Sequence, residues 1–124
     1  MSSKTDILNE FKRQLLLFLD EMVEQFPNEG DFVVMRILLN DQISINDVMN
    51  NFILQILPLK TMVKERNDNF FLQNNILFED LDKSKVNHFK KIWRSDLLDD
   101  DDKEAMWQWF DMFIKIAEKY QNIV

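Results

Sequence analysis

Few residues of this chain are of a type and spacing that could catalyse a reaction. The 124 residues include no cysteine, one histidine (His88) and one glycine, which excludes thiolate nucleophiles, multi-histidine metal sites and glycine-rich phosphate loops. His88 has no adjacent carboxylate in the sequence, so a surface or helix-capping role is favoured over that of a catalytic base. Carboxylate pairs such as Asp20 with Glu24 are neighbours on a polar helix face, and the Glu-x-x-His pattern of di-iron sites is missing. The sequence therefore predicts no enzyme, no catalytic or metal-binding residue and no cofactor.

The most conspicuous charged run consists of four consecutive aspartates, Asp99 to Asp102. It lacks the alternating ligands, the central glycine and the terminal glutamate of a calcium-binding loop. Acidic side chains in the first turn of a helix interact favourably with the helix dipole, so the run is typical of a helix start. Contact with a cation or with a basic partner is the alternative that the sequence leaves open.

Positive charge is concentrated in the middle of a chain whose formal net charge is −7. Five basic residues and no acidic residue occupy positions 83–94: Lys83, Lys85, Lys90, Lys91 and Arg94. This pattern is typical of the solvated face of an amphipathic helix, and it would also suit a protein partner or nucleic acid. Because the overall negative charge repels nucleic acid, we expect nucleic-acid binding to be the weaker alternative.

Two apolar surfaces are candidates for binding a protein partner. In the last predicted helix, Trp107 and Ile114 fall outside the apolar core stripe, and an exposed tryptophan beside an isoleucine is typical of a protein-binding hot spot. A bundle that wraps this helix on two sides would bury both residues instead. In the first helix, Leu16 and Leu17 fall outside the core stripe, so this helix either lies centrally or offers a second face to a partner. The core stripe of the last helix consists of Met106, Trp109, Phe110 and Phe113.

The elements that must position these residues are predicted to be helices. Apolar residues recur at three- and four-residue spacing, and one glycine and two prolines leave little material for hairpins. The first helix is predicted over about residues 4–26, beginning at a capping box formed by Ser3 and Asp6. Asp31 is predicted to cap a second helix over residues 32–40, which is expected to be almost wholly buried.

The rest of the chain continues the helical pattern. Ser44 and Asp47 form a second capping box that opens a third helix, and Pro58 ends that helix and begins a fourth element. Residues 67–82 are predicted to form a short helix, a turn and an apolar plug that closes the bundle. The last two helices are predicted over residues 83–94 and 99–121.

Together these elements predict an all-α fold, with a single helical domain over residues 1–124. We expect a single compact bundle of about five to six helices, with long first and last helices. The longest apolar runs are far shorter than the ~20 residues needed to span a bilayer, and no targeting segment is visible. The sequence therefore predicts a soluble intracellular protein that makes no contact with a membrane.

Three stretches carry a resemblance to a known group of proteins: FKRQLLLFLDEMVEQFPNEGD, KVNHFKKIWRSDLL and DKEAMWQWFDMFIKIAEKY. Over roughly residues 11–120, the chain resembles small uncharacterised all-helical proteins of nucleocytoplasmic giant DNA viruses. The abundance of Phe, Ile, Asn and Lys, whose codons are AT-rich, agrees with such an origin. The resemblance implies a viral protein and brings no catalytic residues with it.

We therefore expect a non-enzymatic helical protein-interaction module of a giant DNA virus. It would act as a virion component or as an adaptor to host or viral machinery, in the host cytoplasm or the viral factory. A protein partner is expected, and a homodimer through the first or last helix is compatible with the sequence. The alternative is a nucleic-acid-associated protein that uses the basic residues between 83 and 94, and steep weakening of binding by salt would favour it.

Overall fold

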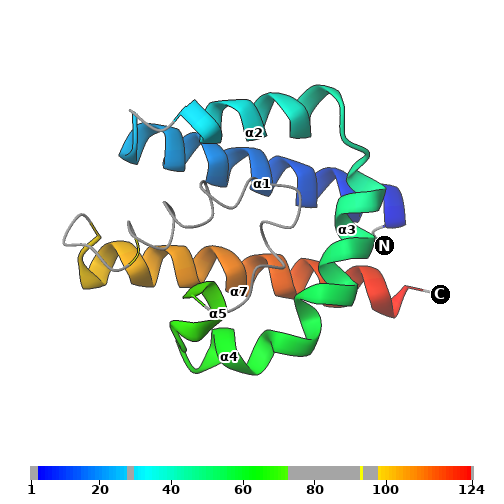
Figure 1. Cartoon of the computed structure of the whole chain (residues 1–124). Helices are drawn as coiled ribbons and strands as arrows, with labels where there is room; N and C mark the ends of the chain where they lie inside the picture. Colours follow the sequence, from blue (N-terminus) through cyan, green and yellow to red (C-terminus); the bar gives the residue numbers. More distant parts are fainter. Residues whose placement is uncertain (1–2, 28–29, 73–92, 94–97, 124) are drawn as a thin grey trace.

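The residues that the structure describes form helices joined by short turns. The computed structural model describes residues 3–27, 30–72, 93 and 98–123 (Figure 1). Over these ranges no strand is present, and four helices have eleven residues or more. The all-α fold class is thus confirmed. The predicted bundle of five to six helices is not, because the helix expected over 83–94 lies outside the described residues except for Trp93.

The two long helices each begin at a capping box, which the sequence predicts for the first of them. Helix α1 spans Lys4–Gln25 and α7 spans Asp100–Asn122. The Ser3 hydroxyl accepts from the Asp6 backbone N–H at 3.1 Å, and the Asp6 carboxylate accepts from the Ser3 N–H at 3.2 Å. These reciprocal bonds satisfy two backbone donors that a helix start leaves free.

The same device begins α7, where the Asp99 carboxylate accepts from the Asp102 N–H at 2.7 Å. The aspartate run thus lies at the start of a helix, as predicted, with Asp99 at the N-cap and the other three aspartates in the first turn. We expect Asp99→Ala to lower the free energy of unfolding by about 1 kcal/mol, because it removes the cap. Urea denaturation of this variant beside Asp101→Ala, an exposed neighbour, checks the prediction. Equal losses in the two variants would contradict a capping role.

The shorter helices lie where the sequence predicts them, but two of their predicted caps differ from the structure. Helix α2 spans Gly30–Asp41, so Asp31 lies inside the helix and the prediction that it caps this helix is wrong. Helix α3 spans Ile45–Gln55 and has Ser44 at its N-cap, but the Ser44 side chain makes no capping hydrogen bond. Pro58 ends α3 as predicted. The elements that follow α3 are the 3₁₀ helix Leu57–Leu59, which contains Pro58, α4 over Lys60–Lys64 and α5 over Asn69–Leu72.

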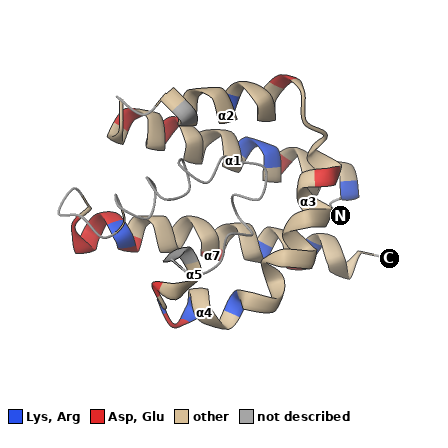
Figure 2. Ribbon diagram, viewed as in Figure 1, with Lys and Arg blue, Asp and Glu red and all other residues tan. Residues whose placement is uncertain are grey.

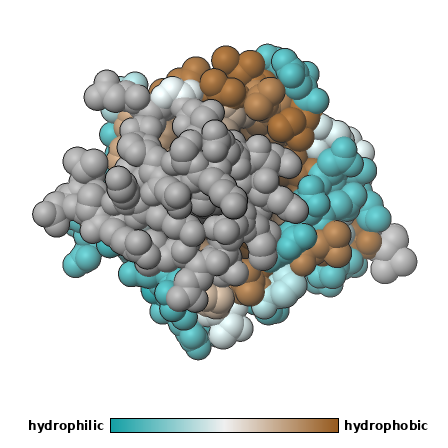
Figure 3. Space-filling model, viewed as in Figure 1, coloured by the Kyte–Doolittle hydropathy of each residue, from teal (hydrophilic) through white to brown (hydrophobic). Residues whose placement is uncertain are grey.

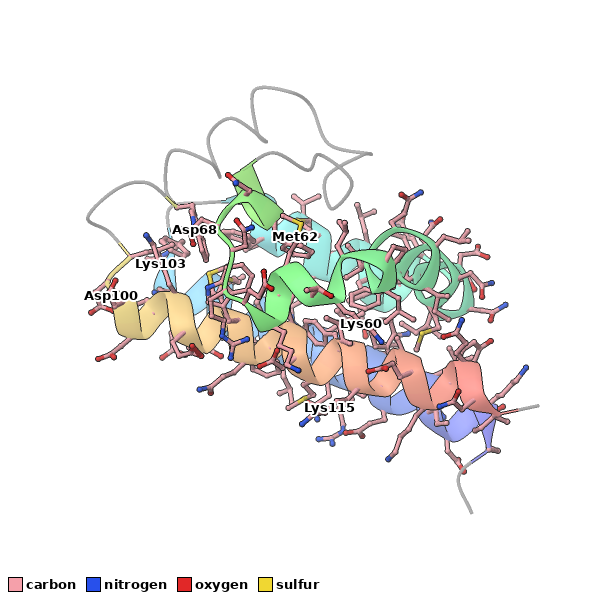
Figure 4. All side chains as sticks on the ribbon, turned by 90° about the horizontal axis from the view of Figure 1, so that it is seen from below. Lys60, Met62, Asp68, Asp100, Lys103 and Lys115 are labelled. Atoms are coloured by element: carbon pink, nitrogen blue, oxygen red, sulfur yellow. The ribbon has the colours of Figure 1, made fainter. Side chains whose placement is uncertain are left out.

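Helix α1 lies between α2 and α7, and both of these neighbours run antiparallel to it (Figure 1). Helix α3 crosses one end of this layer, while α4 and α5 lie beside α7 (Figures 1 and 4). Lys60 of α4 forms an ion pair with Glu118 of α7, with 3.5 Å between Nζ and Oε2. Helix α7 thus has neighbours on two sides, whereas α2 packs mainly on α1.

The centre of the core is a cluster of phenylalanines from three helices. The Phe11 ring of α1 lies 5.5 Å from Phe52 of α3 and 6.1 Å from Phe113 of α7, measured between centroids and in edge-to-face geometry. Phe18 of α1 lies 5.6 Å from Phe113. Edge-to-face pairs add about 0.5–1.5 kcal/mol to the free energy gained by burying their area. This cluster fixes how α1, α3 and α7 meet.

Arg66, in the turn between α4 and α5, forms hydrogen bonds with two carboxylates of α7. The Arg66 guanidinium donates two hydrogen bonds to Glu104, both of 3.0 Å, and two to Asp111, of 3.0 and 2.9 Å. Arg66 also has a φ of 55°, in the left-handed region that non-glycine residues rarely adopt. The hydrogen bond to Asp111 raises the pKa of the Arg66 guanidinium above its ordinary value against the effect of burial, and the bond to Glu104 adds to this rise.

Candidate functional site

The structure contradicts the placement of Trp107 and Ile114 on the surface. Their side chains are 3% and 7% exposed. The Trp107 ring lies 5.6 Å from Trp93 and 6.1 Å from Phe70 of α5, so the face of α7 that carries it is covered. Asp111, on the same face, is held by Arg66. The alternative of a helix wrapped on two sides is therefore correct, and no partner is expected at these two residues.

Trp109, which the sequence assigns to the core, is less buried than Trp107. Its side chain is half-buried, and its indole Nε1 donates a hydrogen bond of 2.7 Å to Glu21 Oε2 of α1. The ring stacks on Phe113 with 6.0 Å between centroids. The apolar periodicity of α7 thus ranks its two neighbouring tryptophans in the wrong order, because α4, α5 and Trp93 add a second covered face.

Leu16 and Leu17 of α1 have different surroundings. Leu16 is half-buried, on the side of α1 that faces α2: one turn to each side of it, Lys12 bonds to the Asn40 carbonyl and Asp20 pairs with Arg36. Leu17 remains 43% exposed. Of the four apolar residues proposed for a partner, only Leu17 lies open to solvent.

The basic candidates Lys83, Lys85, Lys90, Lys91 and Arg94 lie outside the described residues, so their arrangement stays a prediction. His88 lies outside them as well. Among the residues that are described, no group of three or more His, Asp and Glu side chains is arranged to hold a metal ion. No helix in the described part of the chain is long and apolar enough to cross a membrane.

An apolar surface on α2 is the feature that the sequence reasoning missed. Val33, Val34 and Ile37 are 42%, 52% and 49% exposed. Positions three and four residues apart are neighbours on a helix, so these side chains form one continuous patch, here called the α2 face. The space-filling view shows apolar atoms gathered over α2 (Figure 3). The expectation that α2 is almost wholly buried is wrong, because α2 is an outer helix.

Over its described residues, α2 is covered only on the side that packs against α1. Leu39 is 7% exposed, and Phe32 is half-buried with its ring 6.1 Å from Phe26, at the end of α1. These positions are seven residues apart, as expected for one stripe of a helix that packs on a single neighbour. A helix whose sequence is apolar all round but which has one covered side must leave apolar side chains in water.

Polar contacts flank the α2 face on the side of α1. The Arg36 guanidinium pairs with the Asp20 carboxylate, and Lys12 Nζ donates to the Asn40 carbonyl at 3.1 Å. Asp41, exposed at the end of α2, accepts from the Asn40 side-chain amide at 2.9 Å. Acidic and basic residues line the α1–α2 pair, while most of α2 itself carries no charge (Figure 2). The α2 face is thus an apolar patch with a polar rim.

Such an arrangement offers no chemistry of its own but suits a docking surface. Contiguous exposed apolar patches with a polar rim mark interaction sites more often than isolated apolar residues do. Of the other exposed large apolar residues in the described part of the chain, Leu17, Leu54 and Met112 lie on α1, α3 and α7, and Ile43 lies just after the end of α2. Comparison with known proteins adds no assignment: no protein-family model, no curated protein and no solved structure matches this chain.

Proposed function

We propose that the protein is a non-enzymatic helical protein-interaction module that binds its partner on the α2 face. The observation that carries this proposal is the joint exposure of Val33, Val34 and Ile37 on one helix. About half of each side chain is in contact with water, and a partner that covered them would gain the free energy of burying that apolar area. Leu17 of α1 is exposed as well, at 43%.

The biological setting of the proposal rests on the sequence resemblance. We propose a protein of a giant DNA virus, inside the infected cell, that acts as a virion component or as an adaptor to host or viral machinery. In either role the module would be a rigid helical surface that brings another protein into a complex.

Partner capture from producing cells tests this function. We expect a protein that co-purifies with the tagged chain to be recovered at least about tenfold less with Val34→Gln/Ile37→Gln, because two central contacts lose their apolar area. Leu54→Gln is the matched control, since Leu54 is 69% exposed on α3. All three proteins should unfold at similar urea concentrations, as surface substitutions change stability little.

Nuclease treatment of half of each sample separates the two classes of partner. Recovery that survives nuclease and depends on the α2 face supports the protein-interaction module. Loss of all bound material after nuclease would contradict it and favour the basic residues between 83 and 94. Equal recovery by the wild type and Val34→Gln/Ile37→Gln would show that the α2 face is not the docking surface.

A further inference from the structure

The α2 face has acidic residues beside both of its ends. Asp41 lies one turn beyond Ile37 on the same side of α2, and its side chain is exposed. The contacts Asp20–Arg36 and Lys12–Asn40 show that α1 and α2 run antiparallel. Glu24, one turn beyond Asp20 on α1, is therefore placed beside the start of α2, where it too is exposed.

Two cations, Arg36 and Lys12, lie near the α2 face. Arg36 pairs with Asp20, and the ammonium of Lys12 donates to a backbone carbonyl. Within the described part of the chain, neither Glu24 nor Asp41 forms an ion pair. Because the carboxylates Asp20, Glu24 and Asp41 outnumber the cations Lys12 and Arg36, the apolar centre of the face has a frame of net negative charge, on a protein whose net charge is −7.

This frame disfavours a second copy of the chain as the occupant. A two-fold contact brings the same face against itself. With the two α2 helices antiparallel, Asp41 of one copy approaches Glu24 of the other. With the helices parallel, the two Asp41 side chains approach each other. Like charges meet in both cases, and the net charge of each copy adds repulsion at longer range.

We propose that the occupant is an amphipathic helix of another protein, with an apolar stripe that lies along α2 and Lys or Arg residues at both ends of that stripe. This inference rests on the proposed function and specifies its partner. A helix suits the surface because α2 is itself convex, and side-by-side helices interdigitate their side chains. Basic residues at the two ends of the stripe would lie near Glu24 and Asp41.

Two synthetic helical peptides of about 18 residues, or five turns, test the proposal. Both carry the same leucine stripe, and they differ only in flanking residues, Lys in one and Glu in the other. We expect the Lys-flanked peptide to bind the full chain at one site, measured by fluorescence anisotropy. The Glu-flanked peptide should bind at least about tenfold more weakly, since its charges repel the frame.

Variants of the chain separate the apolar contribution to peptide binding from the contribution of charge. Val34→Gln/Ile37→Gln should weaken the Lys-flanked peptide about tenfold or more, while Leu54→Gln leaves its affinity unchanged. Glu24→Gln/Asp41→Asn should weaken binding severalfold and flatten its salt dependence, since two attracting charges are removed. Binding that is insensitive to the α2 substitutions, or equal for the two peptides, would overturn the proposal.

The result also separates this inference from the proposed function. If the partner from cells depends on Val34 and Ile37 but the Lys-flanked peptide does not bind, the docking surface is right and its occupant is wrong. Sedimentation equilibrium tests whether a second copy of the chain occupies the α2 face. A concentration-dependent dimer that Val34→Gln/Ile37→Gln abolishes would identify the occupant as a second copy and overturn the proposal, whereas a monomer at all concentrations supports it.

Discussion

Trp107→Ala is expected to lower the free energy of unfolding by about 3–5 kcal/mol, the cost of truncating a large core aromatic residue. Trp107 is 3% exposed and forms ring contacts with Trp93 and Phe70. Removing the indole would leave a cavity between α7 and the elements that cover it, and the Trp93 ring would lose a perpendicular partner. Urea denaturation followed by circular dichroism measures the loss.

Two other substitutions on α7 serve as comparisons for the loss of stability in Trp107→Ala. Trp109→Ala should cost less than Trp107→Ala, because Trp109 is half-buried and part of its area remains in water. Met112→Ala should change the free energy of unfolding by no more than about 0.5 kcal/mol, since Met112 is 39% exposed. A greater loss at Trp109 than at Trp107 would restore the order that the sequence periodicity predicts and contradict the packing of α7.

The second large effect is expected at Arg66. Arg66→Gln should lower the free energy of unfolding by about 2 kcal/mol, because Glu104 and Asp111 would each lose two charge-assisted hydrogen bonds to one planar guanidinium. Arg66→Lys should recover only part of this loss. A lysine keeps the charge but lacks the planar fork that serves two carboxylates at once.

Arg36→Gln is the matched control for the arginine prediction. Arg36 and Asp20 form a more exposed pair, with side chains 39% and 49% exposed, and such pairs contribute about 0–1 kcal/mol. The two variants should therefore differ in urea denaturation. If Arg66→Gln were no more destabilising than Arg36→Gln, the Arg66 pairs would be no stronger than an ordinary surface contact, and the turn between α4 and α5 would be held by other means.

The sequence predicts best where the structure depends on neighbouring residues alone. The capping box Ser3–Asp6 forms as expected, since both partners lie within one turn, and α7 begins at the aspartate run as expected. The box predicted at Ser44 and Asp47 is an exception, because the Ser44 side chain makes no capping hydrogen bond. Pro58 also ends α3 as expected, because the geometry of a proline is local.

The failures concern which helices become neighbours. Periodicity shows that Trp107 lies off the main stripe of α7, but not that α5 and Trp93 cover that second stripe. It shows that α2 is apolar all round, but not that only one side of it is packed. Nothing in the sequence around Arg66 indicates that carboxylates 38 and 45 residues away would bind it. These contacts are decided by tertiary packing.

The phenylalanine cluster has a consequence for how the chain acquires its structure. Phe11 and Phe113 are in contact although about a hundred residues separate them, and Phe52 lies between them in the chain. During synthesis, α1, α2 and α3 leave the ribosome before α7 exists. Until then, the aromatic side chains of α1 and α3 lack their contacts with α7. The antiparallel pair α1–α2 closes a short loop and can form early, whereas the core closes only when α7 is released.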